Sequence, residues 1–438
     1  MDLLLEAILY TFLCIVILFG VAVYHAVQTH KAFKHVNVKE LQSLNVPRES
    51  LFRIFQPHLI AMNEIASRGY SSVFSLVQVL IGVVPTCDMV LEIWKPAFEC
   101  YNIIVPNFLN LPEMLLPGYD IRELVSLSNY VSSRANMCAY CTSHCCSFAM
   151  RRGVVPEKLR DALDALLKEG GGDTMFTPRE RAVIRVSYGL GSVPSCLTKE
   201  DTDMLESTLA SPDQVEWIVA SCAMFGSFNK YMDGLGIPLE NDTYFETMDY
   251  MDSKFVTSMS KNPASAGFTN TNSNNNNNVG SKNGSKATAL PVPPKDDWKR
   301  LLAVIYHGLR PGGALALDKK LLKGVPTTAE ESIVFLKKLC GATFPVLANL
   351  HHTRFRRALT AVLSKNFVTD GISLHTKVLA GIQYCEILQN KQLQCELEEI
   401  LALYKSKNNI KDTENPNRHV VLMKDSLEKI KEQLLNIL

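Results

Sequence analysis

The spacing of apolar residues predicts helices along most of the first half of the chain. Between residues 50 and 240, apolar side chains recur every three to five positions, as in Leu51, Ile54 and Leu59. This spacing places them on one face of an α-helix. The region lacks the alternation of apolar and polar residues that marks a half-buried strand. The pattern therefore predicts an all-α fold.

Three sequence motifs mark the starts of later helices. They are Thr177-Pro-Arg-Glu180, Thr198-Lys-Glu-Asp201 and Ser211-Pro-Asp-Gln214. In each motif a hydroxyl at the N-cap can accept a backbone N–H of the first turn, and an acid or amide follows three residues later. Two of the motifs also place proline at the first helical position. We expect each motif to begin a helix.

The N-terminal segment contains the longest apolar run. Ala7 to Tyr24 has no formal charge and is rich in Leu, Ile, Val and Phe, and its length is close to that needed to cross a membrane as a helix. A cleaved signal peptide is the alternative. The residues before the run include Asp2 and Glu6 instead of Lys or Arg, which favours an uncleaved membrane anchor over residues 1–25.

Charges beside this run predict its orientation. A spacer, residues 26–49, carries Lys31, Lys34 and Lys39, whereas no Lys or Arg precedes the run. Because positive residues are enriched on the cytoplasmic side of membrane helices, we expect a single-pass protein whose main body is cytosolic.

A second uncharged run extends from Ser71 to Cys87. It is short, contains Gln78 and is interrupted by Pro85, so a buried core helix is favoured over a second membrane segment.

A change in composition divides the rest of the chain. From about residue 256 to residue 294 it is rich in Asn, Ser, Gly, Thr and Lys, which cannot bury enough apolar surface to order itself. We therefore predict a helical domain over 50–255, a disordered linker over 256–294 and a second helical domain over 295–438.

The second helical domain contains a segment that aligns with the first. Residues 378–395 align without a gap with residues 124–141, so that Cys395 matches Cys141 while Gln392 matches Cys138. This segment is either a degenerate internal repeat or a coincidence. In both cases it lacks the cysteine pair.

Charge and cysteine content exclude two classes of protein. The net charge is +1, so the chain has no electrostatic footprint for nucleic acid, which is not an expected partner. The 12 cysteines are spread through apolar segments instead of framing a small loop-rich module. Most are therefore expected to be buried thiols in a reducing compartment, without a disulfide scaffold.

One short segment concentrates reactive side chains. In Asn136-Met-Cys-Ala-Tyr-Cys-Thr-Ser-His-Cys-Cys-Ser147, a helix that starts at Cys138 places Cys141 one turn later, with His144 and Cys145 beyond it on a shared face. A helix N-terminus stabilises a thiolate and a neighbouring imidazole can take the proton, so we expect a depressed thiol pKa. A thiolate that attacks a peroxide becomes a sulfenic acid, which a second thiol converts to a disulfide.

Two other interpretations of this cluster remain open. The Cys-x-x-Cys spacing also arises by chance burial of small apolar residues. Zinc is the second alternative, because cysteine and histidine are its usual ligands. However, Cys138, Cys141, His144 and Cys145 lie on one helical face, and one face cannot surround a tetrahedral ion. We therefore expect no metal and no bound cofactor.

Several segments together resemble the alkylhydroperoxidase D and carboxymuconolactone decarboxylase family. The segments are Asp120-Ile-Arg-Glu-Leu-Val, the cysteine motif from Asn136 to His144, the helix that starts at Thr177, and Gln214 to Pro238. The resemblance covers roughly residues 50–240. It implies a helical domain that forms homo-oligomers and reduces hydroperoxides with a cysteine pair, which an external dithiol or thiol reductant protein then regenerates.

The resemblance also implies roles for individual residues. The second cysteine of the pair, Cys141, would attack the peroxide, and Cys138 would resolve the product. The family's relay histidine lies four residues after the second cysteine, where this chain has Cys145, with His144 one residue earlier. The family's relay glutamate lies twelve residues before the first cysteine. Ser126 occupies that position, and Glu123 lies one helical turn earlier as a substitute.

This departure in the relay supports an alternative function of another class. Two helical bodies, of which only one carries a cysteine pair, tethered to a membrane and joined by a linker, also resemble the sestrins in arrangement. A membrane-tethered regulatory or redox-sensing scaffold with a vestigial site is therefore the alternative to a thiol peroxidase.

Overall fold

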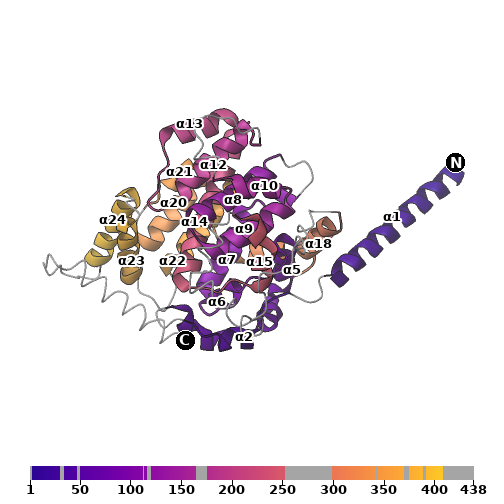
Figure 1. Cartoon of the computed structure of the whole chain (residues 1–438), viewed down its shortest axis with the longest axis horizontal. Coiled ribbons are helices and arrows are strands. Elements are labelled where there is room, and N and C mark those ends of the chain that lie inside the picture. The colour runs from indigo at the N-terminus through magenta and orange to yellow at the C-terminus, as the bar shows by residue number, and fades with distance from the viewer. Residues whose placement is uncertain are drawn as a thin grey trace, which may run out of the picture.

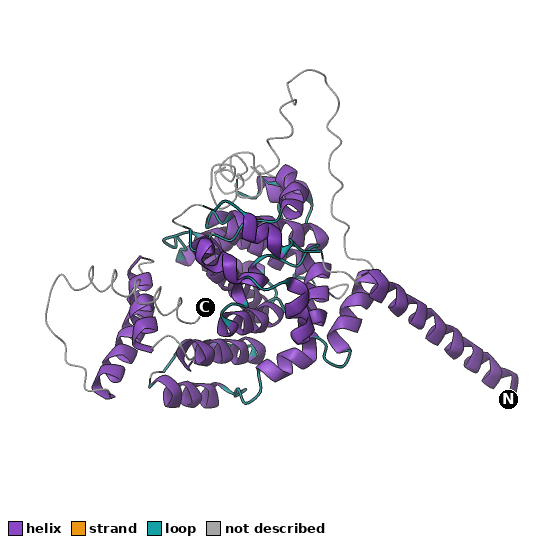
Figure 2. Ribbon diagram, turned by 90° about the horizontal axis from the view of Figure 1, so that it is seen from below, coloured by secondary structure: helices purple, strands orange, loops and turns teal. Residues whose placement is uncertain are grey.

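The computed structural model describes residues 2–29, 34–46, 50–111, 113–115, 120–163, 175–251, 298–341, 343–368, 374–387 and 391–407. Helices and connecting loops make up these residues, and none of them belongs to a strand (Figures 1 and 2). The all-α fold class is therefore confirmed. The predicted linker, 256–294, lies outside the described residues, as does the chain beyond Lys407.

An antiparallel helical hairpin forms the centre of the first body. Its two helices are α8 (Arg122–Ala135) and α9 (Ala139–Arg151), and α9 also packs against α5 (Ser71–Ile81), α14 (Pro212–Leu235) and α15 (Asn241–Thr247). Every residue of α9 is buried. A helix enclosed on all sides can hold reactive groups away from bulk water.

The three capping motifs begin helices, as predicted. Thr177 and Thr198 each form a reciprocal capping box, at the starts of α12 (Pro178–Gly191) and α13 (Lys199–Thr208). The Ser211 hydroxyl accepts the backbone N–H of Gln214 at the start of α14. Each cap satisfies an N–H group that has no partner within its helix.

The remaining helices of the first body surround this centre. They are α2 (Val38–Ser43), α3 (Phe52–Phe55), α4 (Met62–Ile65), the π-helical turn Ala66–Tyr70, α6 (Cys87–Leu91), α7 (Lys95–Phe108) and α10 (Pro156–Asp161). Helix α5, which covers most of the second uncharged run, is 11 residues long, and Phe74, Val79 and Leu80 are buried in the core. The expectation of a core helix there is confirmed.

The helices of the second body are α18 (Trp298–Leu309), α19 (Ala314–Leu321), α20 (Ala329–Cys340), α21 (Val346–Asn349), α22 (Thr353–Val368), α23 (Leu374–Ile387) and α24 (Lys391–Lys407). The second body packs against the first through α18, α19 and α22. Ala303, Val304 and Phe355 belong to the core of the first body. A smaller apolar cluster joins α20 to α23 and α24. The predicted domain boundaries stay predictions, but helices from both sides of the linker share one core.

Helix α1 (Asp2–Thr29) projects away from this body (Figures 1 and 2). Leu5–Tyr24 is long and apolar enough to cross a membrane, and none of it is buried in the protein. A signal sequence has the same properties, so the anchor stays a prediction. The exposed apolar surface of α1 distinguishes it from the core helices.

Candidate functional site

The first cysteine of the cluster caps helix α9. Cys138 has extended backbone angles, and its Sγ accepts the backbone N–H of Cys141 at 3.3 Å. The chain enters this cap through Met137, whose φ of 62° is rare for a residue other than glycine. The predicted helix start at Cys138 is therefore confirmed.

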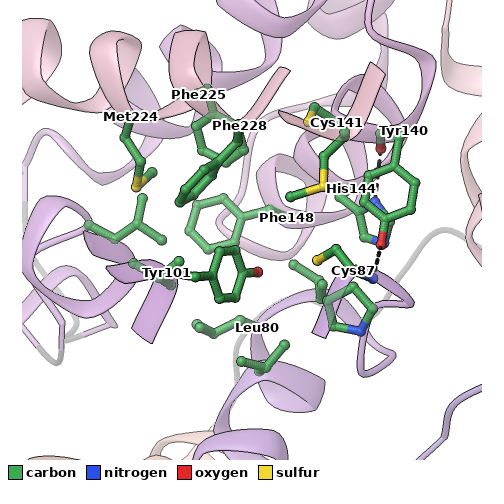
Figure 3. Close-up of a pocket in the computed structure, with 16 residues that line it drawn as sticks. Leu80, Cys87, Tyr101, Tyr140, Cys141, His144, Phe148, Met224, Phe225 and Phe228 are labelled. Atoms are coloured by element: carbon green, nitrogen blue, oxygen red, sulfur yellow. Dashed lines mark hydrogen bonds between the residues drawn. The ribbon is translucent and has the colours of Figure 1, made fainter. Parts of the chain in front are cut away.

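The second cysteine lies on the wall of an apolar cavity (Figure 3). The cavity lies between α5, α7, α9 and α14 and has a volume of about 80 Å³. Its main apolar residues are Leu80, Val105, Phe148, Met224, Phe225 and Phe228. The polar groups on its wall belong to Cys87, Tyr101, Tyr140, Cys141 and His144. Cys138 does not line the cavity, so the two thiols of the pair have different surroundings.

The surroundings of Cys138 are polar. The charge of Asp233 opposes ionisation of the Cys138 thiol, and the positive charge of Lys230 acts on the Asp233 carboxyl group. Asp233 is on the exposed side of α14. Loss of solvent around its carboxyl group raises the pKa of Asp233 to about 6, against the opposing effects of Cys138 and Lys230.

Burial governs the acidity of the cysteine pair. It raises the pKa of the Cys138 thiol, although hydrogen bonds from the Cys141 thiol and backbone oppose this shift. The pKa of Cys141 lies well above its usual value because of burial and because its thiol donates to Cys138. Both shifts are opposite to the expectation from the sequence. A helix N-terminus stabilises a thiolate, but here full desolvation of the sulfur outweighs it.

His144 is held at both ring nitrogens. Its Nδ1 lies 2.8 Å from the carbonyl oxygen of Tyr140, and its Nε2 lies 3.0 Å from Oε2 of Glu240. A carbonyl oxygen only accepts, so Nδ1 carries a hydrogen. Burial lowers the pKa of His144, but the Glu240 carboxylate outweighs this effect and raises the pKa above its usual value. The favoured form is therefore an imidazolium paired with Glu240.

This ion pair is part of a buried network. Oε1 of Glu240 accepts the Tyr140 hydroxyl at 3.0 Å and the backbone N–H of Thr86. The Tyr140 hydroxyl in turn accepts the backbone N–H of Cys87 at 3.1 Å (Figure 3). Burial opposes ionisation of Glu240, but His144 and the backbone N–H of Thr86 lower its pKa. The network fixes the ring of His144 and leaves it no free lone pair to take a proton from Cys141.

The other predicted site residues lie apart from the cavity. Cys145 is fully buried, with its Sγ 3.5 Å from the Ser133 hydroxyl of α8. Glu123 is exposed in the first turn of α8 and lies beside Gly153, which follows α9. The hairpin is antiparallel, so Glu123 is at the end opposite Cys138. The structure therefore does not bring Glu123 to the cysteine pair. Glu123 lies one helical turn farther along α8 from the pair than Ser126 does.

Several residues of the site were missed by the sequence interpretation. Glu240 follows the helix cap at Gly236 and is 100 positions from Tyr140, and no sequence pattern marks a buried acid in such a loop. Tyr101 and Cys87 come from segments outside the motif, and Figure 3 shows the Tyr101 hydroxyl directed toward Cys87. Tyr140 had a detectable signal, since it lies within the motif one helical turn before His144.

The described residues show no group of three or more His, Cys, Asp or Glu side chains arranged to hold a metal ion. All 12 cysteines, including Cys138 and Cys141, are free thiols.

Comparisons with known proteins find few similar chains. No family model matches the sequence, and no curated protein matches it. Among solved structures, the apo form of the debrominase Bmp8 is 20% identical, with a TM-score of 0.38, over 44% of this chain and 95% of that chain. A cysteine-to-alanine variant of Bmp8 in complex with 2,3,4-tribromopyrrole is 18% identical, with the same TM-score and coverage.

Proposed function

We propose that the protein is a thiol-dependent oxidoreductase that reduces hydroperoxides through a dithiol–disulfide cycle of Cys138 and Cys141. The observation that carries this proposal is the placement of the two free thiols. They lie within one helical turn, the backbone N–H of Cys141 donates to Sγ of Cys138, and of the two only Cys141 faces the apolar cavity. One thiol thus has access to a small apolar substrate, and the other is in position to form the disulfide.

The cycle balances with the groups present and an external dithiol. The Cys141 thiolate attacks the outer oxygen of the hydroperoxide, the O–O bond breaks, and the products are a sulfenic acid on Cys141 and an alcohol. The Cys138 thiol then attacks the Cys141 sulfur and releases water as the disulfide forms. An external dithiol or thiol reductant protein supplies two electrons and two protons to restore both thiols.

Asp233 provides a path for the proton that Cys141 must lose. In this proposal the proton passes from the Cys141 thiol to Cys138 and on to the Asp233 carboxyl group, whose charge acts on the Cys138 thiol. With a pKa of about 6, this carboxyl group is ionised at neutral pH and accepts a proton on the solvent side of α14. In this proposal Asp233 replaces the relay of His144 and Glu123 expected from the family resemblance.

Tyr101 supplies a proton to the product. Burial, together with Cys87 and Asp88, raises the pKa of its phenol well above the usual value, so the hydroxyl keeps its hydrogen. An alkoxide released in the cavity can take this hydrogen as the alcohol forms, and the Tyr101 phenolate then takes a proton back from water, which balances the proton that Cys141 gave up. Since the other walls are almost entirely apolar, we expect organic hydroperoxides to be better substrates than hydrogen peroxide.

The test measures consumption of an organic hydroperoxide by the full chain with a dithiol reductant. We expect Cys141→Ser to abolish turnover. We expect Cys138→Ser to form a sulfenic acid once, without a disulfide and without further turnover. Cys196→Ser, which changes an exposed thiol, is the matched control and should retain activity. Equal rates in the wild type and in Cys141→Ser would rule out the enzyme.

A redox-sensing scaffold is the second candidate function. It is favoured by the raised pKa of both thiols, which slows their reaction at neutral pH. A sensor would form a reversible disulfide between Cys138 and Cys141 under mild peroxide but would show no sustained turnover with the dithiol. Membership of the alkylhydroperoxidase D family, homo-oligomerisation and a cytosolic body on a membrane anchor are parts of the same proposal and require their own measurements.

A further inference from the structure

Helix α18 packs beside the point where α1 meets the body (Figure 1). Side chains of α1 are exposed from Leu5 through Val21 and become half-buried at Ala22 and Val23. Among the described helices, α18 forms the main contact of α1. The contact therefore lies at the end of the apolar span.

This position corresponds to the surface of a bilayer if α1 crosses one. The 20 residues of Leu5–Tyr24 make a helix about 30 Å long, which equals the thickness of the hydrocarbon core. An element packed against the last turn of this span lies at the level of the lipid headgroups.

Contacts with α5 show which end of α18 is nearest to α1. Arg310, which follows α18, hydrogen-bonds Ser72 in the first turn of α5. Because the two helices pack along each other, the start of α18 lies toward the end of α5. The chain that follows α1 reaches this end of α5, because the backbone N–H of Lys34 donates to the side chain of Gln78. Trp298, at the start of α18, is therefore at the end of α18 that is nearer to where the chain leaves α1.

The residues at this end have the chemistry of a membrane interface. Trp298 is 60% exposed, and the Lys299 ammonium lies 5.7 Å from the centre of its ring. Ala303, Val304 and His307 form the buried side of the helix. Tryptophan is enriched where one end of a side chain is apolar and the other is wet, and lysine and arginine favour anionic headgroups.

We propose that α18 is an interfacial helix, with Trp298 inserted at headgroup level and Lys299 against the phosphates of anionic lipids. Its partner is the surface of the membrane that α1 crosses. The proposal rests on the anchor that is part of the proposed function, and it does not depend on the redox chemistry. It adds a second contact that fixes how the body sits on the membrane.

Helix α5 connects this surface to the candidate site. It packs against α18 and also contributes Val77, Leu80 and Ile81 to the wall of the cavity. One helix therefore separates the proposed membrane contact from the space that Cys141 faces.

The test uses the full chain in vesicles of phosphatidylcholine and phosphatidylserine with bromine on the acyl carbons just below the headgroups. Bromine quenches only tryptophan side chains that reach it. We expect strong quenching in the wild type, loss of the quenched fraction in Trp298→Phe, and retention of that fraction in Trp94→Phe. Quenching should also fall when phosphatidylserine is replaced by phosphatidylcholine.

Flotation of the same vesicles and hydroperoxide consumption are measured in parallel. If the chain floats but the wild type and Trp298→Phe are quenched equally, α18 does not touch the membrane and the proposal is wrong. If the chain does not float, the anchor and the proposal both fail. Quenching that is independent of phosphatidylserine would overturn the assignment of anionic headgroups. Turnover of hydroperoxide in either case reports separately on the proposed function.

Discussion

Asp233 is a surface acid whose charge acts on the Cys138 thiol. We predict that the rate of sulfenic acid formation on Cys141 rises with pH through about 6, as the Asp233 carboxyl group loses its proton and becomes able to accept another. In Asp233→Asn this rise should disappear and the rate at neutral pH should fall by about 10² or more, the usual contribution of a positioned base. Stopped-flow measurement of the rate of sulfenic acid formation with an organic hydroperoxide, at a series of pH values, checks this prediction.

The control for this prediction is Asp203→Asn. Asp203 is an exposed acid of α13 paired with Lys199, and its substitution should leave the pH profile unchanged. A wild-type rate that is flat between pH 5 and pH 7 would contradict the role of Asp233.

The ion pair of His144 and Glu240 makes the stability of the fold depend on pH. The raised pKa of His144 contributes stability that is complete below the unfolded value of about 6.5 and is lost as pH rises through the folded value. The lowered pKa of Glu240 contributes stability that is complete above the unfolded value of about 4.3 and is lost as pH falls through the folded value. The window of greatest benefit therefore lies between about pH 4.3 and pH 6.5.

We predict that Glu240→Gln lowers the free energy of unfolding by about 3 kcal/mol within this window, because His144 loses the charge that balances it. The difference between the wild type and the variant should shrink on both sides of the window. Denaturant unfolding at several pH values measures it, and a difference that does not change with pH would contradict the ion pair.

At the scale of elements, helix α12 packs closely against α8, one of the two helices of the α8–α9 hairpin. A Cβ added to Gly191, the last residue of α12, would lie 2.8 Å from Cα of Ser132 in α8. We predict that Gly191→Ala destabilises the protein by about 1–3 kcal/mol, the typical cost of overpacking. Gly226→Ala, in α14, is the matched control. A Cβ there meets no atom within 4 Å, so the variant should gain about 0.5–1 kcal/mol. Thermal unfolding of both variants compares them directly.

Local sequence signals predicted the starts of helices well, whereas they did not predict contacts between residues far apart in the sequence. The caps at Thr177, Thr198 and Ser211 involve residues three positions apart, so the sequence contains both partners. The start of α9 at Cys138 followed from the same kind of local reasoning. The pKa values of the thiols could not be predicted in this way. They depend on burial by α5, α8 and α14, and the residues next to Cys138 in the sequence do not indicate that burial.

At the scale of the whole molecule, Arg354 joins the two bodies. This residue of α22 donates to Oδ1 of Asn107 at 2.9 Å, to Oδ1 of Asn110 at 3.0 Å and to Glu113 at 3.0 Å. We predict that Arg354→Ala lowers the free energy of unfolding by about 1–3 kcal/mol, because the oxygens lose a charged donor.

The same variant should increase hydrogen exchange in α7 and α22, where the two bodies meet. Lys320→Ala, on the exposed side of α19, should change neither quantity. Unchanged exchange in α7 after loss of Arg354 would show that the second body is held by its apolar contacts alone.

The thiols differ in exposure, so their alkylation rates can report which parts of the protein open to solvent. Cys14, Cys196 and Cys395 are exposed, whereas the other nine thiols are buried. With α1 in a membrane, a bulky maleimide should label Cys196 and Cys395 at once and the buried thiols only as fast as the protein opens, while Cys14 lies within the proposed span Leu5–Tyr24. Cys141 belongs to the slow set for such a reagent. The ratio of its alkylation rates by small and bulky reagents would measure the size limit of access to its sulfur in a single mass spectrum.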